Sequence, residues 1–266
     1  MQVFSVVHFK FVHFQINKLF NMKKQQYLIF DIETAPLDFD TLSESQKEYI
    51  LRNTNTEEEI QNKKFEMALS PITAQIVCIG TQLMQSADEG GWEVVGRAAL
   101  SVDNEFENGR KEHIKLSTGD DCYLTNEAKL LEDFWAILRK YDQATLISFN
   151  GRSFDAPFMM LRSAIHRIRP SRNLMSGTKF NYPLHIDLID ELTFYNPSPY
   201  SASKRFNFDF YTRTFGIKSP KSEGVDGSMV GQLFKEGKIV EISEYCMRDI
   251  NATWELFLIW YNYLKY

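Results

Sequence analysis

The stretch Tyr27-Leu28-Ile29-Phe30-Asp31-Ile32-Glu33-Thr34 decides the fold class of this chain of 266 residues. A short apolar run that ends in carboxylates is typical of a buried strand that reaches the edge of a sheet. Because successive side chains of a strand point to opposite faces, we expect Asp31 and Glu33 to project from the same face. The stretch therefore predicts a central strand with two carboxylates side by side at its end.

Similar patterns along the rest of the chain predict one α/β domain, with a mixed five-stranded sheet and flanking helices. Apolar runs bounded by turn residues predict the five strands at 27–32, 72–84, 92–102, 145–149 and 184–188. Apolar residues at helical spacing predict helices at 126–141, 206–215, 228–235 and 243–263, with exposed helix inside 42–68. Asp155, followed by Pro157, predicts one more helix with Asp155 as its N-cap.

Composition and cysteine usage exclude several classes of protein. Hydrophobic residues make up 44% and charged residues 24% of the chain, which is ordinary globular usage and excludes disordered, collagen-like and coiled-coil chains. Three scattered cysteines are too few for a disulfide framework or a thiolate zinc site, which favours a cytoplasmic location. No run approaches the roughly 20 apolar residues of a membrane-spanning helix, so we expect no membrane partner.

The first 25 residues carry four lysines and no acid, and polar residues interrupt their apolar runs. A signal peptide needs an unbroken apolar stretch and a cleavage site with small residues, and neither is present. We expect residues 1–25 to be an N-terminal extension that is either disordered or not part of the native protein, with Met22 as the functional start. The folded domain is then expected to span residues 26–266.

Three acidic motifs occur in an order and context that point to a shared site. Asp31 and Glu33 end the first strand, and Asp155 opens a helix after a later strand. Tyr245 and Asp249 are four residues apart, hence on one face of the C-terminal helix. Each motif alone is weak, but their conjunction is strong. Carboxylates held together repel unless a cation lies between them, and oxygen ligands select Mg²⁺ or Mn²⁺.

These motifs resemble those of the DEDD superfamily of 3′–5′ exonucleases, in its tyrosine-bearing (DEDDy) branch. The matching segments are Asp31-Ile32-Glu33-Thr34, Ile147–Asp155 and Tyr245-Cys246-Met247-Arg248-Asp249. The stretches around His185-Ile186-Asp187-Leu188 and Gly224–Ser228 look like the predicted exonucleases related to the proofreading domain of family-B DNA polymerases. The resemblance extends over residues 27–264 and implies a ribonuclease-H-like fold for a nuclease without an attached polymerase.

The resemblance also implies a mechanism and the roles of individual residues. Asp31, Glu33, Asp155 and Asp249 would bind two divalent ions, Mg²⁺ or Mn²⁺, roughly 3.5–4 Å apart, for phosphodiester hydrolysis. Tyr245 would orient the attacking water. We expect substrate contacts from Thr34, Asn150, Arg152, Phe154 and Arg162. The expected partner is nucleic acid, in particular the 3′ end of single-stranded DNA, whereas the choice between DNA and RNA and any polymerase or repair partner are left open.

The net charge of −5 conceals an uneven distribution. Residues 156–185 contain five basic residues and no acid, whereas residues 31–66 contain ten acids and four bases. A basic stripe of this kind suits a phosphate backbone, although a solvated face is an equally good interpretation. Six aromatic residues are candidates for base stacking, but most are expected to belong to the core: Phe154, Phe180, Tyr182, Phe194, Tyr195 and Tyr200.

Two other functions compete with the nuclease. Asp31-Ile32-Glu33-Thr34 superficially resembles the aspartyl-phosphate loop of haloacid-dehalogenase-type phosphatases, but those need Asp where Glu33 stands. A non-catalytic nucleic-acid-binding module on the same fold is the other alternative, and the complete set of acids argues against it. His185 and Asp187, on one predicted strand, are expected to be a hydrogen-bonded structural pair, and Cys246 a packing residue rather than a nucleophile.

Overall fold

A computed structural model describes residues 24–106 and 108–265, so the prediction for the N-terminal extension falls almost entirely outside the described residues. The centre of the molecule is one mixed sheet of seven strands in the order β4-β5-β3-β2-β1-β6-β7. The strands are β1 (Gln26–Pro36), β2 (Ala74–Ser86), β3 (Trp92–Val102), β4 (Glu112–Lys115), β5 (Asp121–Thr125), β6 (Thr145–Ser148) and β7 (His185–Asp187).

The single α/β domain is confirmed, but the number of strands was wrong. All five predicted strands form; β4 and β5 extend the sheet beyond β3, where β5 pairs parallel with β3 and antiparallel with β4. Both are short and only partly apolar, so their pairing depends on the neighbouring strand and not on a pattern of their own. β1 pairs antiparallel with β2 and parallel with β6, which places it inside the sheet.

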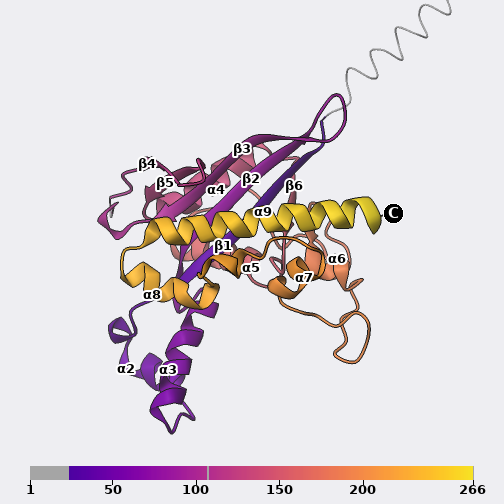
Figure 1. The fold of residues 1–266 in the computed structure, drawn as a ribbon. Helices are drawn as coiled ribbons and strands as arrows, with labels where there is room; N and C mark the ends of the chain where they lie inside the picture. The colour runs from indigo at the N-terminus through magenta and orange to yellow at the C-terminus, as the bar shows by residue number, and fades with distance from the viewer. Residues whose placement is uncertain (1–23, 107, 266) are drawn as a thin grey trace, which may run out of the picture.

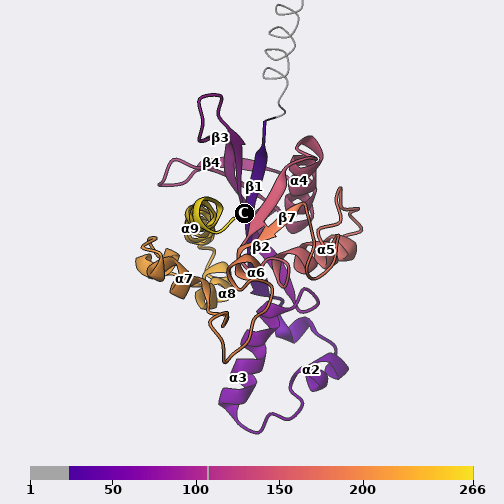
Figure 2. The same cartoon turned by 90° about the vertical axis from the view of Figure 1, so that its right-hand side faces the viewer.

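Helices cover both faces of the sheet (Figures 1 and 2). The long helix α9 lies across one face against β1, β2 and β3, and α4 packs on the other face against β2 and β3. The α-helices are α2 (Glu44–Ile50), α3 (Glu57–Glu66), α4 (Glu127–Lys140), α5 (Asp155–Ile165), α6 (Leu188–Leu192), α7 (Phe208–Thr214), α8 (Val230–Lys235) and α9 (Ile239–Tyr263). Short 3₁₀ turns occupy Phe39–Thr41, Met67–Leu69, Asn104–Phe106, Pro220–Glu223 and Gly227–Met229.

The core is organised around β1, which is buried on both faces. On one face the ring of Tyr27 lies 4.8 Å from that of Phe257 in α9. On the other face the ring of Phe30 lies 5.7 Å from that of Phe134 in α4. Alternation along the strand therefore directs Asp31 and Glu33 toward the face that α9 covers.

Gly80 lets α9 approach the sheet closely. A Cβ atom at this position would stand 2.7 Å from Cγ1 of Ile250 and 2.9 Å from Sγ of Cys246, distances at which neighbouring atoms must shift. Gly80 is also the cross-strand partner of Asp31. The helix thus comes nearest to the sheet beside the first carboxylate.

The acidic segment between β1 and β2 forms an arm that projects away from the body of the domain (Figures 1 and 2). Its helices α2 and α3 have no buried residue, and each begins with a capping box, at Ser43 and Thr56 respectively. Local capping therefore stabilises helices that have little packing to support them. Within the described residues, no helix has both the length and the apolar character to cross a membrane.

Arg162 lies in the interior and not on the surface that was expected to bind substrate. Its side chain is 5% exposed, and its Nε donates a 2.8 Å hydrogen bond to Oε1 of Glu127 while Nη2 donates to Oε2 at 2.5 Å. Glu127 also accepts a hydrogen bond from the backbone N–H of Ile76, which ties α4 and α5 to β2. The guanidinium is thus committed to a buried structural ion pair, which corrects the expectation that it contacts nucleic acid.

Replacing Arg162 should destabilise the fold. In Arg162→Ala the buried carboxylate of Glu127 loses its main counter-charge, so we expect the free energy of unfolding to fall by about 3 kcal/mol in urea denaturation. The exposed Arg169→Ala is the matched control, with an expected change within about 0.5 kcal/mol. Equal effects of the two substitutions would contradict a structural role for the buried pair.

Candidate active site

Asp31 and Glu33 lie on the α9 side of β1, as their alternation predicts. Their cross-strand partners on β2 are Gly80 and Cys78, and a β-bulge follows between Glu33 and Thr34. Sγ of Cys246, on α9, lies 3.9 Å from Oδ2 of Asp31. The two carboxylates are therefore held between the central strands and the C-terminal helix.

Asp155 approaches the end of β1 from the edge that pairs with β6, whereas β2 pairs along the other edge. The pairing of β1 with β6 ends at Ile29 and Ile147, and further along β1 the backbone N–H of Ile32 donates a 3.0 Å hydrogen bond to Oδ1 of Asp155. The carboxylate thus binds a strand N–H that lies beyond the paired segment. Asp155 is the first residue of α5, and Phe154 holds the N-cap position without a side-chain hydrogen bond, so the prediction that Asp155 is the N-cap was wrong.

Tyr245 and Asp249 lie on one face of α9, and both are buried. Burial raises the pKa of both groups, and the interaction of the Tyr245 hydroxyl with the Asp249 carboxylate raises the pKa of Tyr245 further and lowers that of Asp249. The negative charges of Asp249, Glu33 and Asp31 all act on Tyr245, with Asp249 the strongest of the three. Five of the predicted residues, Asp31, Glu33, Asp155, Tyr245 and Asp249, therefore come together from three elements far apart in the sequence.

Burial raises the pKa of all four acids, and the charges of neighbouring carboxylates raise the pKa of Asp31, Glu33 and Asp155 further. Burial is the largest cause for each of the four acids, followed for Asp31 by the charge of Asp155 and for Glu33 by that of Asp249. The pKa of Asp31 and that of Glu33 lie well above the usual range, and those of Asp155 and Asp249 rise to about 7. Without a counter-ion, this group resists full ionisation at neutral pH.

Two of these carboxylates, with a neighbouring thiol, could hold a divalent cation. Oxygen atoms of Asp31 and Glu33 and the sulfur of Cys246 lie within 4.8 Å of one another, close enough to surround one ion. A cation would offset the repulsion that raises the pKa values, and carboxylate oxygens suit Mg²⁺ and Mn²⁺. The interaction of the Cys246 thiol with Cys78, together with its burial, holds the pKa of this thiol well above its usual range. A thiol that stays protonated agrees with a packing role for Cys246.

The other predicted substrate residues lie around this group but have structural partners of their own. The hydroxyl of Thr34 donates a 2.8 Å hydrogen bond to the Ala68 carbonyl. Phe154 is half-buried, with its ring 5.4 Å from that of Phe158. Nη1 of Arg152 donates to the carbonyls of Leu174 and Ser176, and its guanidinium lies 4.2 Å from the centre of the Tyr182 ring. Asn150 adopts a positive φ of 63° in the loop that leads to Asp155.

Asp187 positions this loop, a role that the sequence did not reveal. Its fully buried carboxylate accepts hydrogen bonds from the backbone N–H of Asn150 at 2.7 Å and of Arg152 at 2.8 Å. The expected pairing of Asp187 with His185 is not what the structure shows, because Nε2 of His185 lies 2.7 Å from the Ser148 hydroxyl. The alternation of His185 and Asp187 on one strand indicated that both have structural roles, but it did not identify their hydrogen-bond partners.

The close packing of the loop between β6 and α5 requires glycine at position 151. A Cβ atom there would stand 2.2 Å from Oγ of Ser148 and 3.4 Å from Oδ2 of Asp155. The loop between β6 and α5 is thus pressed against β6, and β7 holds it from the other side. This arrangement fixes the path that delivers Asp155 to β1.

Two cations near Asp249 were also not assigned a function from the sequence. The positive charges of Arg248 and Lys221 lower the pKa of Asp249, against the larger effect of its burial. Nε of Arg248 donates a 3.3 Å hydrogen bond to the Pro220 carbonyl, which joins α9 to the turn that carries Lys221. Positive charge therefore borders the acidic group on this side.

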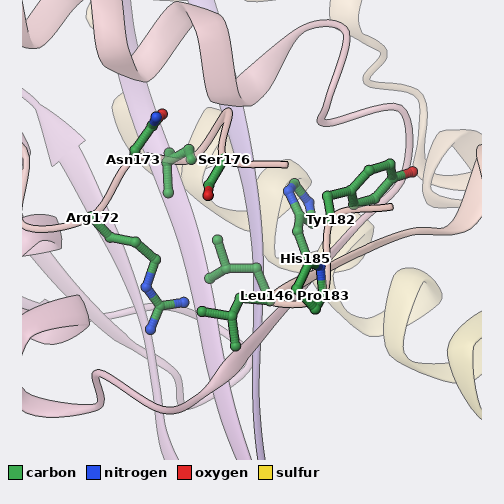
Figure 3. Close-up of a pocket in the computed structure, with 9 residues that line it drawn as sticks. Leu146, Arg172, Asn173, Ser176, Tyr182, Pro183 and His185 are labelled. Atoms are coloured by element: carbon green, nitrogen blue, oxygen red, sulfur yellow. The ribbon is translucent and has the colours of Figure 1, made fainter. Parts of the chain in front are cut away.

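The basic stripe predicted over residues 156–185 is not a continuous surface. Besides Arg162, Arg172 is directed inward, where its guanidinium binds the carbonyls of Ala144, Tyr141 and Asp142. Arg172 borders a pocket of about 150 Å³, with Tyr182 and His185 on the opposite side (Figure 3). None of the five clustered residues lines this pocket, so it is separate from the acidic site.

In the absence of divalent metal, stability should fall as the pH rises. The raised pKa values mean that the folded protein binds more protons than the unfolded chain between about pH 4 and pH 7. We expect the metal-free melting temperature to decrease from about pH 5 to about pH 8, and Mn²⁺ to restore it at the higher pH. Asp31→Asn should flatten this dependence. A melting temperature that rises over this interval would contradict the proposed burial of like charges.

Replacing Asp187 should disturb the loop without touching the clustered acids. Asp187→Asn leaves one oxygen acceptor for the three N–H donors of Asn150, Arg152 and Ile189, so we expect the free energy of unfolding to fall by about 1–3 kcal/mol. Amide hydrogen exchange at Asn150 and Arg152 should accelerate. The matched control is Asp190→Asn, which changes a carboxylate that binds the Tyr182 hydroxyl. Unchanged exchange in Asp187→Asn would exclude the positioning role.

Comparison with known proteins bears on the fold and on the family of this chain. A solved structure of the family B DNA polymerase from the hyperthermophilic archaeon Pyrobaculum calidifontis superposes with a TM-score of 0.52 and 13% identity, over 89% of this chain and 24% of the polymerase. The chain thus spans about a quarter of that polymerase, and the similarity establishes the ribonuclease-H-like fold. An uncharacterized protein of Methanocaldococcus jannaschii is 28% identical over an alignment 167 residues long, which covers 55% of this chain and 82% of that protein.

A sequence-family model matches residues 95–264, more than half of the chain. The matched segment includes Asp155, Tyr245 and Asp249, and begins after the strand that carries Asp31 and Glu33. The chain therefore belongs to the family of predicted 3′–5′ exonucleases related to the exonuclease domain of PolB.

Proposed function

We propose that this protein is a metal-dependent 3′–5′ exonuclease of the tyrosine-bearing DEDD branch, with its catalytic domain over residues 26–266. The observation that carries the proposal is the convergence of four carboxylates, three buried and Asp31 half-buried, with one buried tyrosine, from β1, α5 and α9. Family membership supports a nuclease in general. The assignment of the branch and of the metal chemistry rests on the residues themselves.

Asp31, Glu33, Asp155 and Asp249 would hold two Mg²⁺ or Mn²⁺ ions. When bound, these ions would activate a water molecule and offset the negative charge that develops on the scissile phosphate. The Tyr245 hydroxyl would orient that water. Burial and the charge of Asp249 raise the pKa of Tyr245, so the phenol remains protonated and acts by positioning rather than as a base.

The substrate we propose is the 3′ end of single-stranded DNA. Four carboxylates repel a polyanion, and the neighbouring cations Arg248 and Lys221 would reduce this repulsion. We expect the terminal nucleotide to contact main-chain groups of Glu33 and Thr34 and the side chains of Asn150 and Phe154. These residues lie beside the acids in the sequence. RNA is the alternative polymer, because nothing in this site requires the absence of a 2′-hydroxyl.

The two competing functions have less support. A haloacid-dehalogenase-type phosphatase would need Asp at position 33, where this chain has Glu33. A non-catalytic binding module would have no need for four acids whose burial and mutual repulsion raise their pKa values. Neither alternative accounts for a buried tyrosine on which the charge of the fourth carboxylate acts.

The proposal predicts metal-dependent shortening of a 5′-labelled single-stranded DNA. With Mg²⁺ or Mn²⁺ we expect a ladder of products shortened from the 3′ end, and EDTA should prevent it. Asp31→Ala and Asp249→Ala should abolish the ladder, whereas Asp88→Ala, which changes an exposed carboxylate in the β2–β3 turn, should not. Strand binding without shortening would favour the binding module, and phosphate release from small esters would favour the phosphatase.

Tyr245→Phe separates positioning from binding. Removing the hydroxyl should lower kcat by roughly a hundredfold while KM changes little, because the ring and the four carboxylates remain. Single-turnover kinetics on the same labelled strand would measure both constants. A parallel loss of kcat and affinity would contradict a water-orienting role for this hydroxyl.

A further inference from the structure

An unusual number of aromatic side chains are exposed on one short segment of the described chain. Five exposed aromatic residues occur within residues 192–222: Phe194, Tyr200, Phe206, Phe210 and Phe215. The same 31 residues contain five basic residues and one acid, Asp209. Exposed apolar rings are unfavourable in water, so rings gathered in a positively charged segment indicate a binding surface.

Phe206 and Phe210 are held outward by the way in which α7 packs. On its inner side, the rings of Phe208 and Tyr211 lie 4.7 and 5.5 Å from the ring of Phe149. Phe206 and Phe210 are 42% and 57% exposed, and their ring centres are 5.1 Å apart. We call this pair, with the neighbouring Lys204 and Arg213, the α7 platform.

The charges of the α7 platform are interleaved with its rings. The ammonium of Lys204 lies 5.2 Å from the centre of the Phe206 ring. Arg213 is one turn beyond Phe210 on α7, and it forms an i,i+4 ion pair with Asp209 while its side chain stays 62% exposed. Phosphates and bases alternate along a single strand, so alternating cations and ring faces match its chemistry.

The α7 platform is connected to the acidic site in two ways. Phe149, on which α7 packs, directly precedes the loop that delivers Asp155. In the other direction the chain runs from α7 to Lys221, whose charge acts on Asp249. A strand whose 3′ end lay among the carboxylates would therefore find the α7 platform beside its path.

We propose that Phe206 and Phe210 stack against bases upstream of the 3′-terminal nucleotide, so that the α7 platform binds single-stranded nucleic acid and confers a preference for longer strands. This inference rests on the proposed nuclease function. Bases in a duplex cover one another's faces, so a stacking surface selects unpaired strands. Stacking is tolerant of sequence and sugar, so the α7 platform binds DNA and RNA alike.

The test is strand binding by fluorescence anisotropy, in the full chain carrying Asp31→Asn to prevent hydrolysis. Phe206→Ala and Phe210→Ala should each weaken binding of a labelled 15-nucleotide oligothymidylate by roughly tenfold, and a 15-nucleotide oligouridylate should respond in the same way. Binding of a trinucleotide should be unchanged, because it does not extend to the α7 platform. Phe210→Trp should retain affinity, and its added indole fluorescence should be quenched when the strand binds.

Tyr49→Ala is the matched control, since Tyr49 is a 64% exposed ring on the acidic arm. It should leave strand affinity unchanged. Wild-type affinity in both phenylalanine variants, or an equal loss for the trinucleotide and the 15-nucleotide strand, would overturn the proposal. A protein that binds strands through the α7 platform but never shortens them would contradict the nuclease assignment and not the platform.

Discussion

The close grouping of four carboxylates, three of them buried, is the constraint on which the rest of this structure depends. Carboxylates that share a largely buried site repel one another, and their burial limits how far solvent can screen the repulsion. The fold holds them there by independent means: the pairing of β1 fixes Asp31 and Glu33, the loop held by Asp187 delivers Asp155, and Gly80 admits α9. The fold thus maintains an arrangement that is unfavourable until a cation binds.

The same constraint explains why the substrate surface lies outside the acidic group. A polyanion approaching bare carboxylates is repelled, so attraction must come from cations around the site. Lys221 and Arg248 provide it beside Asp249, and the α7 platform provides cations and rings further along the chain. The acidic arm of α2 and α3, formed by the segment after β1, carries much of the remaining negative charge. The net charge of −5 therefore does not reveal the cations around the site.

The features that could be predicted from the sequence are those that local periodicity encodes. Alternation placed Asp31 and Glu33 on one face, and helical spacing placed Tyr245 beside Asp249, whereas the grouping of these pairs with Asp155 came from the order of the motifs and the resemblance to a known family. Partnerships between distant segments were not encoded in this way. The sequence around a basic residue such as Arg162 is the same whether its side chain faces solvent or Glu127. Likewise, β5 depends on its pairing with β3, and β4 on its pairing with β5. For the same reason the sequence identified Asp187 as polar but not as the acceptor for the Asn150 loop.

The most direct test of the central claim is anomalous diffraction from crystals of the full chain soaked in Mn²⁺, with data collected at the manganese absorption edge. The account predicts anomalous peaks among the carboxylates of Asp31, Glu33, Asp155 and Asp249, and their loss in the Asp31→Asn protein. A map without a peak at this place, or with manganese bound only elsewhere on the molecule, would contradict it.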